Sequence, residues 1–340
     1  MRSADGVRHA SCAVLLLLAA APLWGSPALE PPTVHVQRYA MGTMVDLFAY
    51  HESREVAEAA VERAWAEFVR LDDVLSSFKP ASDLSRLNRE GASGFVTVDP
   101  SLYDLVARSI DYARLTGGRF DVTVGPLLRV WKAAWAAGHP PAAADVERAK
   151  ACVGSDLVEL QPPNRIRFTS PCVEIELGGV GKGYAVDRAL DVLRAHGVER
   201  ALVNAGGSSI AAAGAPPGRD GWPVRLGGSI DGRDVLLLRE ASMSTSEQRP
   251  RPFAAAGGGV GEILDPRSGA PVPGAAGVTV VASDGAVAEA LTKALLMTAP
   301  ADAERMLARF GHDVSAIWMG PDGAPAAVHN GPRLALAGPR

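Results

Sequence analysis

The residues best suited to do chemistry in this sequence form a glycine-rich run with one lysine, Glu176-Leu-Gly-Gly-Val-Gly-Lys-Gly-Tyr-Ala-Val-Asp187. The apolar segment 173–177 before it is predicted to be a strand, and apolar residues at helical spacing follow it to Leu193. A strand that enters a helix through glycines gathers backbone N–H groups at the positive end of the helix dipole. Lys182 adds a full charge, so the run favours a phosphate or diphosphate ligand.

The same run has a second interpretation. Its spacing matches neither the Walker A motif nor the dinucleotide fingerprint. A glycine-rich turn that only packs closely, without a ligand, is therefore the alternative.

The elements around this run indicate an α+β fold with mixed sheets and packed helices. Apolar residues recur at helical spacing in four segments, 54–75, about 100–116, 285–297 and 301–310. Strands or hairpins are predicted within 35–50, 157–168 and 201–204, between 222 and 264, and around 321–323. Helices and strands alternate irregularly, which favours α+β over a doubly wound sheet.

Length and composition describe a globular chain with room for one large domain. It has 340 residues, of which 47% are hydrophobic, and a formal net charge of −4. Its sequence contains no long basic stripe, and only 6% of its residues are aromatic. Nucleic acid is therefore not an expected partner.

The N-terminus has the pattern of a secretory signal peptide, predicted over 1–28. Arg2 and Arg8 precede an apolar run over 13–23, and small residues follow it. We therefore expect an exported, periplasmic protein with a linker over 29–37 and a folded domain over 38–335. The run is short for a membrane-spanning helix, but an uncleaved leader that associates the protein with the cytoplasmic membrane is the alternative.

Export would place two cysteines, Cys152 and Cys172, in an oxidising compartment. They flank the predicted hairpin, and a disulfide between them would stabilise the fold by about 3 kcal/mol in the chain-entropy description. Two unpaired thiols are the alternative. The spacing of cysteine and histidine resembles no zinc site.

Seven local motifs occur in order along the chain. They are 41–43, Ser76 with 82–88, 116–127, 176–187, 204–207, 263–269, and 278–282 leading into 288–292. This ordered set resembles the ApbE family of FAD:protein FMN transferases, and the resemblance covers nearly all of the chain between 38 and 297.

The resemblance implies an ApbE-like fold and a specific reaction. The protein would bind FAD with a magnesium ion (Mg²⁺) at the diphosphate and transfer FMN to a Ser or Thr hydroxyl of an acceptor protein, releasing AMP. Cleavage of a diphosphate requires neutralisation of charge on its oxygens. A divalent cation, a lysine and N–H donors can provide this.

By resemblance, eight positions are assigned to the cofactor. They are Met41 at the flavin, Phe78 as a stacking aromatic, Arg119, Phe120 and Asp121 along FAD, Glu176 where the family generally has Asp, Lys182, and Ile263 at the flavin site. Two of them keep an alternative. Phe78 could pack in the core at a helix end, and Asp121 could be a helix cap.

Three positions are assigned to the metal ion. They are the backbone carbonyl of Gly179, Glu289 in place of the usual Asp, and the hydroxyl of Thr292. Lys293 follows where the family often has Thr. An ammonium about 4 Å from Mg²⁺ would cost roughly 8 kcal/mol at an effective dielectric constant of about 20. Lys293 therefore either extends into solvent or itself occupies the place of the cation.

The predicted catalytic residue is Glu262, which stands where the family commonly has a His that assists deprotonation of the acceptor hydroxyl. A carboxylate can act as a general base, and a solvated strand glutamate is the alternative. The departures at Glu262 and Lys293 leave two functions open. One is an active FMN transferase, and the other is a catalytically weak or inert FAD-binding protein or assembly factor on the same fold.

Overall fold

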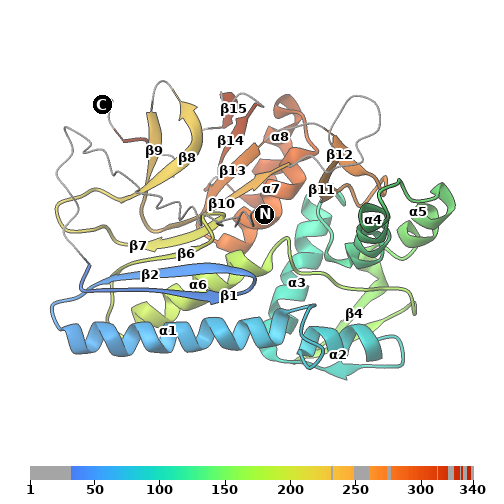
Figure 1. Ribbon diagram of the computed structural model, residues 1–340, viewed down its shortest axis with the longest axis horizontal. Helices are drawn as coiled ribbons and strands as arrows, with labels where there is room; N and C mark the ends of the chain where they lie inside the picture. Colours follow the sequence, from blue (N-terminus) through green and yellow to red (C-terminus); the bar gives the residue numbers. More distant parts are fainter. Residues whose placement is uncertain are drawn as a thin grey trace, which may run out of the picture.

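An antiparallel sheet of eight strands forms the centre of the structure, as Figure 1 shows. This computed structural model describes residues 32–230, 233–248, 260–273, 277–311, 313–320, 325–329, 331 and 335–337. In spatial order the strands are β1 (Val34–Ala40), β2 (Thr43–Tyr50), β6 (Arg200–Ala205), β7 (Ser209–Ala213), β10 (Ala241–Glu247), β13 (Gly277–Ala282), β14 (Ser315–Met319) and β15 (Pro325–His329). Every neighbouring pair is antiparallel.

Three helices, α1 (Arg54–Leu75), α6 (Gly181–Ala195) and α7 (Gly285–Leu296), pack on one face of this sheet. Alternate residues of each strand point to that face, as the two-residue period of a strand requires. In β6, Val203 is fully buried against the helices, whereas Leu202 points to the opposite face. The hydroxyl of Ser53 accepts a hydrogen bond from the first turn of α1 and so fixes where this helix begins.

The hairpin of β8 (Trp222–Ile230) and β9 (Arg233–Leu238) covers the opposite face. Trp222 is its main anchor, because its ring lies against the rings of Phe48 and Tyr50 in β2. The indole Nε1 donates a hydrogen bond of 3.0 Å to the carbonyl of Ala213. The sheet is therefore a central layer with helices on one side and a hairpin on the other.

A second group of elements lies beside the sheet, on the right in Figure 1. It consists of α2 (Asp83–Glu90), α3 (Pro100–Leu115), α4 (Gly125–Ala137), α5 (Ala143–Lys150), the sheet of β3 (Val96–Thr97), β5 (Arg165–Phe168) and β4 (Val158–Gln161), and the pair β11 (Val260–Leu264) and β12 (Pro271–Pro273). The last helix, α8 (Pro300–Leu307), follows α7 and packs into the main core.

Helices α6 and α7 cross with almost no space between their backbones. A Cβ atom on Gly183 would lie 2.1 Å from the carbonyl oxygen of Gly285, and one on Gly285 would lie 2.5 Å from that of Gly183. The carboxylate of Asp187 accepts from the N–H of Gly285 at 2.5 Å, and that of Glu289 accepts from the N–H of Gly183 at 2.6 Å. Each helix therefore supplies an acidic side chain that holds the other helix in place.

The fold class and most of the predicted elements are confirmed. Sheets and helices form an α+β arrangement, and the predicted helix over 54–75 has the bounds of α1. The predicted helices from about 100 and from 285 are α3 and α7, and the hairpin predicted over 157–168 is β4–β5.

Two of the predicted element assignments are wrong. Segment 173–177 is not a strand, because the N–H and C=O of Ile175 pair with the side-chain amide of Asn88 instead of with another strand. The linker predicted over 29–37 extends too far, because β1 begins at Val34 and pairs with β2. The predicted signal peptide over 1–28 and the turn at 321–323 lie outside the described residues.

No helix within the described part of the chain is long and apolar enough to cross a membrane. Cys152 and Cys172 form a disulfide with an S–S distance of 2.11 Å, which confirms that alternative over two free thiols. The disulfide joins the end of α5 to the segment that leads into the glycine-rich run.

We expect Gly183→Ala to lower the free energy of unfolding by about 3 kcal/mol or more, because a methyl group there overlaps the backbone of α7. Urea unfolding followed by circular dichroism measures the change. Gly227→Ala is the control, because Gly227 is exposed on β8 and should change stability by less than about 0.5 kcal/mol. Equal stability of the two variants would show that the helices separate easily.

We expect the double change Cys152→Ala and Cys172→Ala to lower the free energy of unfolding by about 3 kcal/mol, since the disulfide spans a sequence separation of 20. Unfolding of the natural protein with and without a reducing agent gives the same comparison without mutation. The reducing agent should leave the double variant unaffected, and equal stability of both proteins would contradict the expectation.

Candidate functional site

A cavity of about 370 Å³ lies where the glycine-rich turn meets the elements beside the sheet. Its walls come from the segment after α1, the connection between α3 and α4, α4 itself, residues 176–179, β11 and the end of α7. These segments are far apart in the sequence, and only the tertiary fold brings them together.

Eight of the twelve predicted site residues line this cavity. They are Phe78, Arg119, Phe120, Asp121, Glu176, Gly179, Glu262 and Ile263. The other four, Met41, Lys182, Glu289 and Thr292, are not among its lining residues. Lys182, Glu289 and Thr292 lie behind the wall and contact each other or Lys293, which does line the cavity.

Phe78 and Phe120 form two different aromatic surfaces of the cavity. Phe78 is 82% exposed, which excludes the alternative that it packs in the core. The ammonium of Lys132 lies 5.4 Å from the centre of the Phe78 ring. Phe120 is buried, and its ring lies 3.4 Å from the Cβ position of Gly179, so a side chain at Gly179 would press on this ring. An exposed ring beside a cation suits stacking on a flat ligand.

Arg119 contributes an unsatisfied donor to the wall. Its Nη1 donates to the carbonyl of Thr116 at 3.2 Å, but its buried Nε has no hydrogen-bond partner within the described residues. A buried donor without an acceptor is costly, and an acceptor on a ligand would satisfy it.

Asp121 is both a cavity residue and a cap. Its Oδ1 accepts from the N–H and hydroxyl of Thr123, and its Oδ2 accepts from the N–H of Ser155 at 3.0 Å. Burial raises the pKa of this carboxyl, while the hydrogen bonds from Thr123 and Ser155 oppose the rise. The cap predicted as the alternative is therefore present, and a ligand would have to share these oxygens.

The amides of the glycine-rich turn are mostly occupied. Gly178 donates to Oε1 of Glu176, Val180 and Gly181 donate to the carbonyl of Leu177, and Gly183 donates to Glu289. The turn therefore differs from the expected cluster of bare amides. Over residues 178–183 of the described chain, the N–H groups of Gly179 and Lys182 are the two without an acceptor.

Two hydrogen bonds fix the carboxylate of Glu176, one from the N–H of Gly178 in the turn and one from Ser77. The Oε2 of Glu176 accepts a hydrogen bond of 2.8 Å from the hydroxyl of Ser77, next to Phe78. Ser77, Lys132 and Gln248 also support the site, but no local sequence pattern marks them. Gln248 is buried. Its Nε2 donates to the carbonyls of Ile263 and Val272, and its Oε1 accepts from the N–H of Ile263, so it holds β11 against β12.

The carboxylate of Glu289 contacts two lysines beside the cavity. Glu289 is 1% exposed, and its Oε1 lies 3.2 Å from Nζ of Lys182 and 3.7 Å from Nζ of Lys293. Nζ of Lys293 also donates to the hydroxyl of Thr292 at 3.3 Å. Burial lowers the pKa of Lys293 to about 8, and the charge of Glu289 opposes this effect.

These contacts test the predicted metal site, and the residues do not fit a divalent cation. The ammonium of Lys293 contacts both side chains that were predicted to bind the metal ion, Glu289 and Thr292. The Cε of Lys293 lies 3.8 Å from the Cβ position of Gly179. The sequence left open whether Lys293 extends into solvent or occupies the place of the cation. In the structure it occupies the place of the cation.

The two remaining predicted residues lie apart from the turn. Glu262 is exposed at the cavity, where a large partner can reach it. Met41 lies in the turn between β1 and β2, has a φ of 49°, and is partly buried against the main core.

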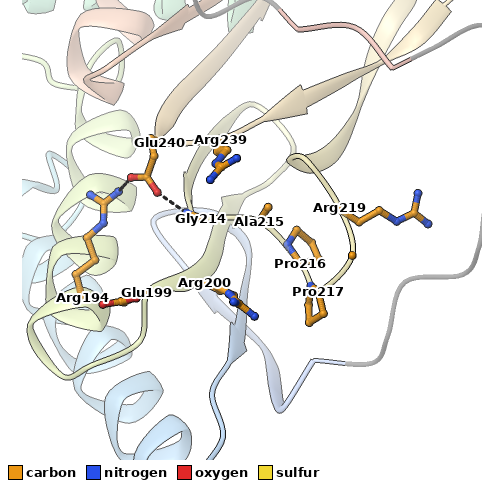
Figure 2. Close-up of a pocket in the computed structure, with 11 residues that line it drawn as sticks. Arg194, Glu199, Arg200, Gly214, Ala215, Pro216, Pro217, Arg219, Arg239 and Glu240 are labelled. Atoms are coloured by element: carbon orange, nitrogen blue, oxygen red, sulfur yellow. Dashed lines mark hydrogen bonds and ion pairs between the residues drawn. The ribbon is translucent and has the colours of Figure 1, made fainter.

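A larger hollow, of about 630 Å³, lies on another part of the surface and contains none of the predicted residues. As Figure 2 shows, Glu240 pairs there with Arg194 and accepts from the N–H of Gly214. Two of its other arginines, Arg200 and Arg239, are exposed. We favour the smaller cavity as the functional site, because it combines apolar walls with a few buried polar groups.

Comparison with solved structures supports the fold. The chain superposes on the ApbE protein of Thermotoga maritima with a TM-score of 0.72 and 28% identity, covering 88% of this chain and 97% of that one. The flavin transferase ApbE of Vibrio cholerae shares the fold with a TM-score of 0.72 and 22% identity, over 88% of this chain and 97% of that chain.

The chain belongs to the ApbE family, because the sequence model of that family matches residues 41–318. A FAD:protein FMN transferase of Rhodobacter capsulatus is 29% identical over 317 residues, which are 90% of this chain and 60% of that protein. The chain therefore spans less than two thirds of that relative. A FAD:protein FMN transferase of Treponema pallidum is 29% identical over 251 residues, 68% of this chain and 69% of that protein.

Asp187 gives the helix crossing a pH dependence. Burial raises its pKa to about 7, with a further contribution from the nearby charge of Asp284, while the hydrogen bond from Ser242 opposes the rise. The folded state therefore keeps a proton that the unfolded state releases near pH 4. Between these two values the unfolding free energy should fall as pH rises, by up to about 1.4 kcal/mol per pH unit.

We expect Asp187→Asn to remove this slope, because the amide does not titrate. Urea unfolding at intervals between pH 4.5 and 7.5 measures it, and Asp111→Asn, at an exposed position on α3, is the control. Parallel pH profiles for the natural protein and Asp187→Asn would contradict the expectation.

Proposed function

We propose that this protein is an exported FAD:protein FMN transferase that attaches FMN to a Ser or Thr of an acceptor redox protein and releases AMP. The observation that carries the proposal is the convergence of Phe78, Arg119, Glu176, Glu262 and Ile263 from separate segments on one cavity. Membership of the ApbE family and relatives with the name FAD:protein FMN transferase support it.

The cavity offers the groups that this transfer needs. Phe78 is an exposed aromatic surface for a flat ring, and the unpaired Nε of Arg119 can donate to an oxygen of the dinucleotide. The hydroxyl oxygen of the acceptor would attack the phosphorus of the FMN half. Its bond to that phosphorus forms as the diphosphate P–O bond breaks, and AMP leaves with the bridging oxygen.

Glu262 is placed to take the hydroxyl proton. It lies at the cavity and is exposed, so an acceptor side chain can approach it from solvent. Because the hydroxyl must lose its proton as the new phosphoester forms, a carboxylate at this position supplies the general base. A His is not required for that step.

Export rests on the leader pattern over 1–28 and is consistent with the disulfide between Cys152 and Cys172, since disulfides persist in oxidising compartments. An uncleaved leader would also associate the protein with the cytoplasmic membrane.

A second candidate is a catalytically weak or inert FAD-binding protein on the same fold. Lys293 favours it, because this lysine fills the place where the family resemblance puts a metal ion. Incubation with FAD and an acceptor that carries a Ser/Thr flavinylation motif separates the two functions. Mass spectrometry of the acceptor should show covalent FMN, whereas bound FAD without any adduct would support the second candidate.

We expect Glu262→Gln to slow FMN transfer by about 10²–10⁴-fold with FAD affinity unchanged, because the amide cannot accept the hydroxyl proton. Single-turnover transfer and FAD titration measure the two effects separately. Glu90→Gln, at an exposed position at the end of α2, is the control and should transfer at the natural rate. A natural rate in Glu262→Gln would return Glu262 to an ordinary surface role.

A further inference from the structure

The position of Lys293 is set by three contacts. It lies on α7 one turn after Glu289, and its ammonium lies 3.7 Å from that carboxylate and 3.3 Å from the hydroxyl of Thr292. Its stem passes Gly179, with Cε 3.8 Å from the Cβ position of that glycine. The side chain is 20% exposed and lines the cavity. Lys293 is therefore the lysine that a ligand in the cavity beside Gly179 would meet.

The charged groups that meet at Glu289 carry one excess positive charge. Two ammonium groups, those of Lys182 and Lys293, share the single carboxylate of Glu289 in this part of the described chain. The second oxygen of Glu289 also accepts from the N–H of Gly183 at the start of α6. One excess positive charge next to a helix N-terminus attracts a diphosphate.

A divalent cation cannot share this place with Lys293. Two like charges, one of them double, would repel strongly at such close range in a partly buried site. The oxygens of Glu289 and Thr292 that would bind the ion already accept hydrogen bonds from Lys182 and Lys293. Lys293 would have to leave before a metal ion could bind there.

We infer that Lys293 is a built-in cation, which neutralises the diphosphate of the bound dinucleotide in place of a divalent metal ion. The inference rests on the proposed function, since it takes FAD to be the ligand. FAD binding by this protein is then independent of divalent cations, in contrast to a site made of Gly179, a carboxylate and a hydroxyl alone.

The test is FAD titration by isothermal calorimetry, in EDTA and in excess MgCl₂. The natural protein should bind FAD with the same Kd, within about twofold, in both solutions. Lys293→Thr should bind at least tenfold more weakly in EDTA and recover in MgCl₂, because it removes the ammonium and leaves room for the ion. Lys293→Met should bind weakly in both solutions, since its side chain keeps the bulk without the charge.

Direct metal binding gives a second readout that does not depend on activity. Electron paramagnetic resonance of Mn²⁺ should show a bound ion in the FAD complex of Lys293→Thr and no such ion in that of the natural protein. Lys150→Thr, at a position on α5 that pairs with Glu147, is the matched control and should behave like the natural protein. Thermal unfolding of each variant shows whether it is folded.

The outcomes separate this inference from the proposed function. A natural protein that binds FAD at least tenfold more weakly in EDTA overturns the role of Lys293 and leaves FMN transfer standing. A natural protein that binds no FAD in either solution overturns both. Identical behaviour of Lys293→Thr and the natural protein in both readouts would also overturn the role of Lys293.

Discussion

The backbone contact between α6 and α7 is the constraint on which the site depends. Because Gly183 and Gly285 have no side chains, the two helices approach until Glu289 reaches the first turn of α6. The glycine-rich turn is thereby fixed against the sheet, with Gly179 facing the cavity and Lys182 directed toward Glu289. A methyl group at the crossing would push these groups apart. The geometry of the site therefore depends on the close packing of α6 and α7.

Acidic side chains inside this crossing determine where positive charge can accumulate. A buried carboxylate must be paired or hydrogen-bonded, and Glu289 meets that requirement with two lysines and one amide. In turn, the carboxylate holds both ammonium groups close together despite their repulsion. The fold thus builds a fixed positive site, which is what a diphosphate requires and what a metal ion would otherwise supply.

The chain keeps the architecture of the ApbE family and departs at Glu262 and Lys293 from the residues that the resemblance leads us to expect at the candidate site. The cavity combines an exposed ring at Phe78, a buried ring at Phe120 and an unsatisfied donor at Arg119. Glu262 lies where solvent and a protein partner can reach it. Phe120 and the Nε of Arg119 are therefore enclosed, whereas Phe78 and Glu262 are open, which suits the proposed transfer to a protein acceptor.

The sequence by itself determined the fold class, the bounds of α1, the disulfide as one of two alternatives, and eight of the residues that line the cavity. These follow from local periodicity and ordered motifs. Tertiary structure alone decided that Phe78 is exposed, that Asp121 is a cap, and that Lys293 rather than Lys182 faces the cavity. The pairing of Lys182 with Glu289 joins residues about a hundred apart in the chain, and local sequence patterns carry no information about such contacts.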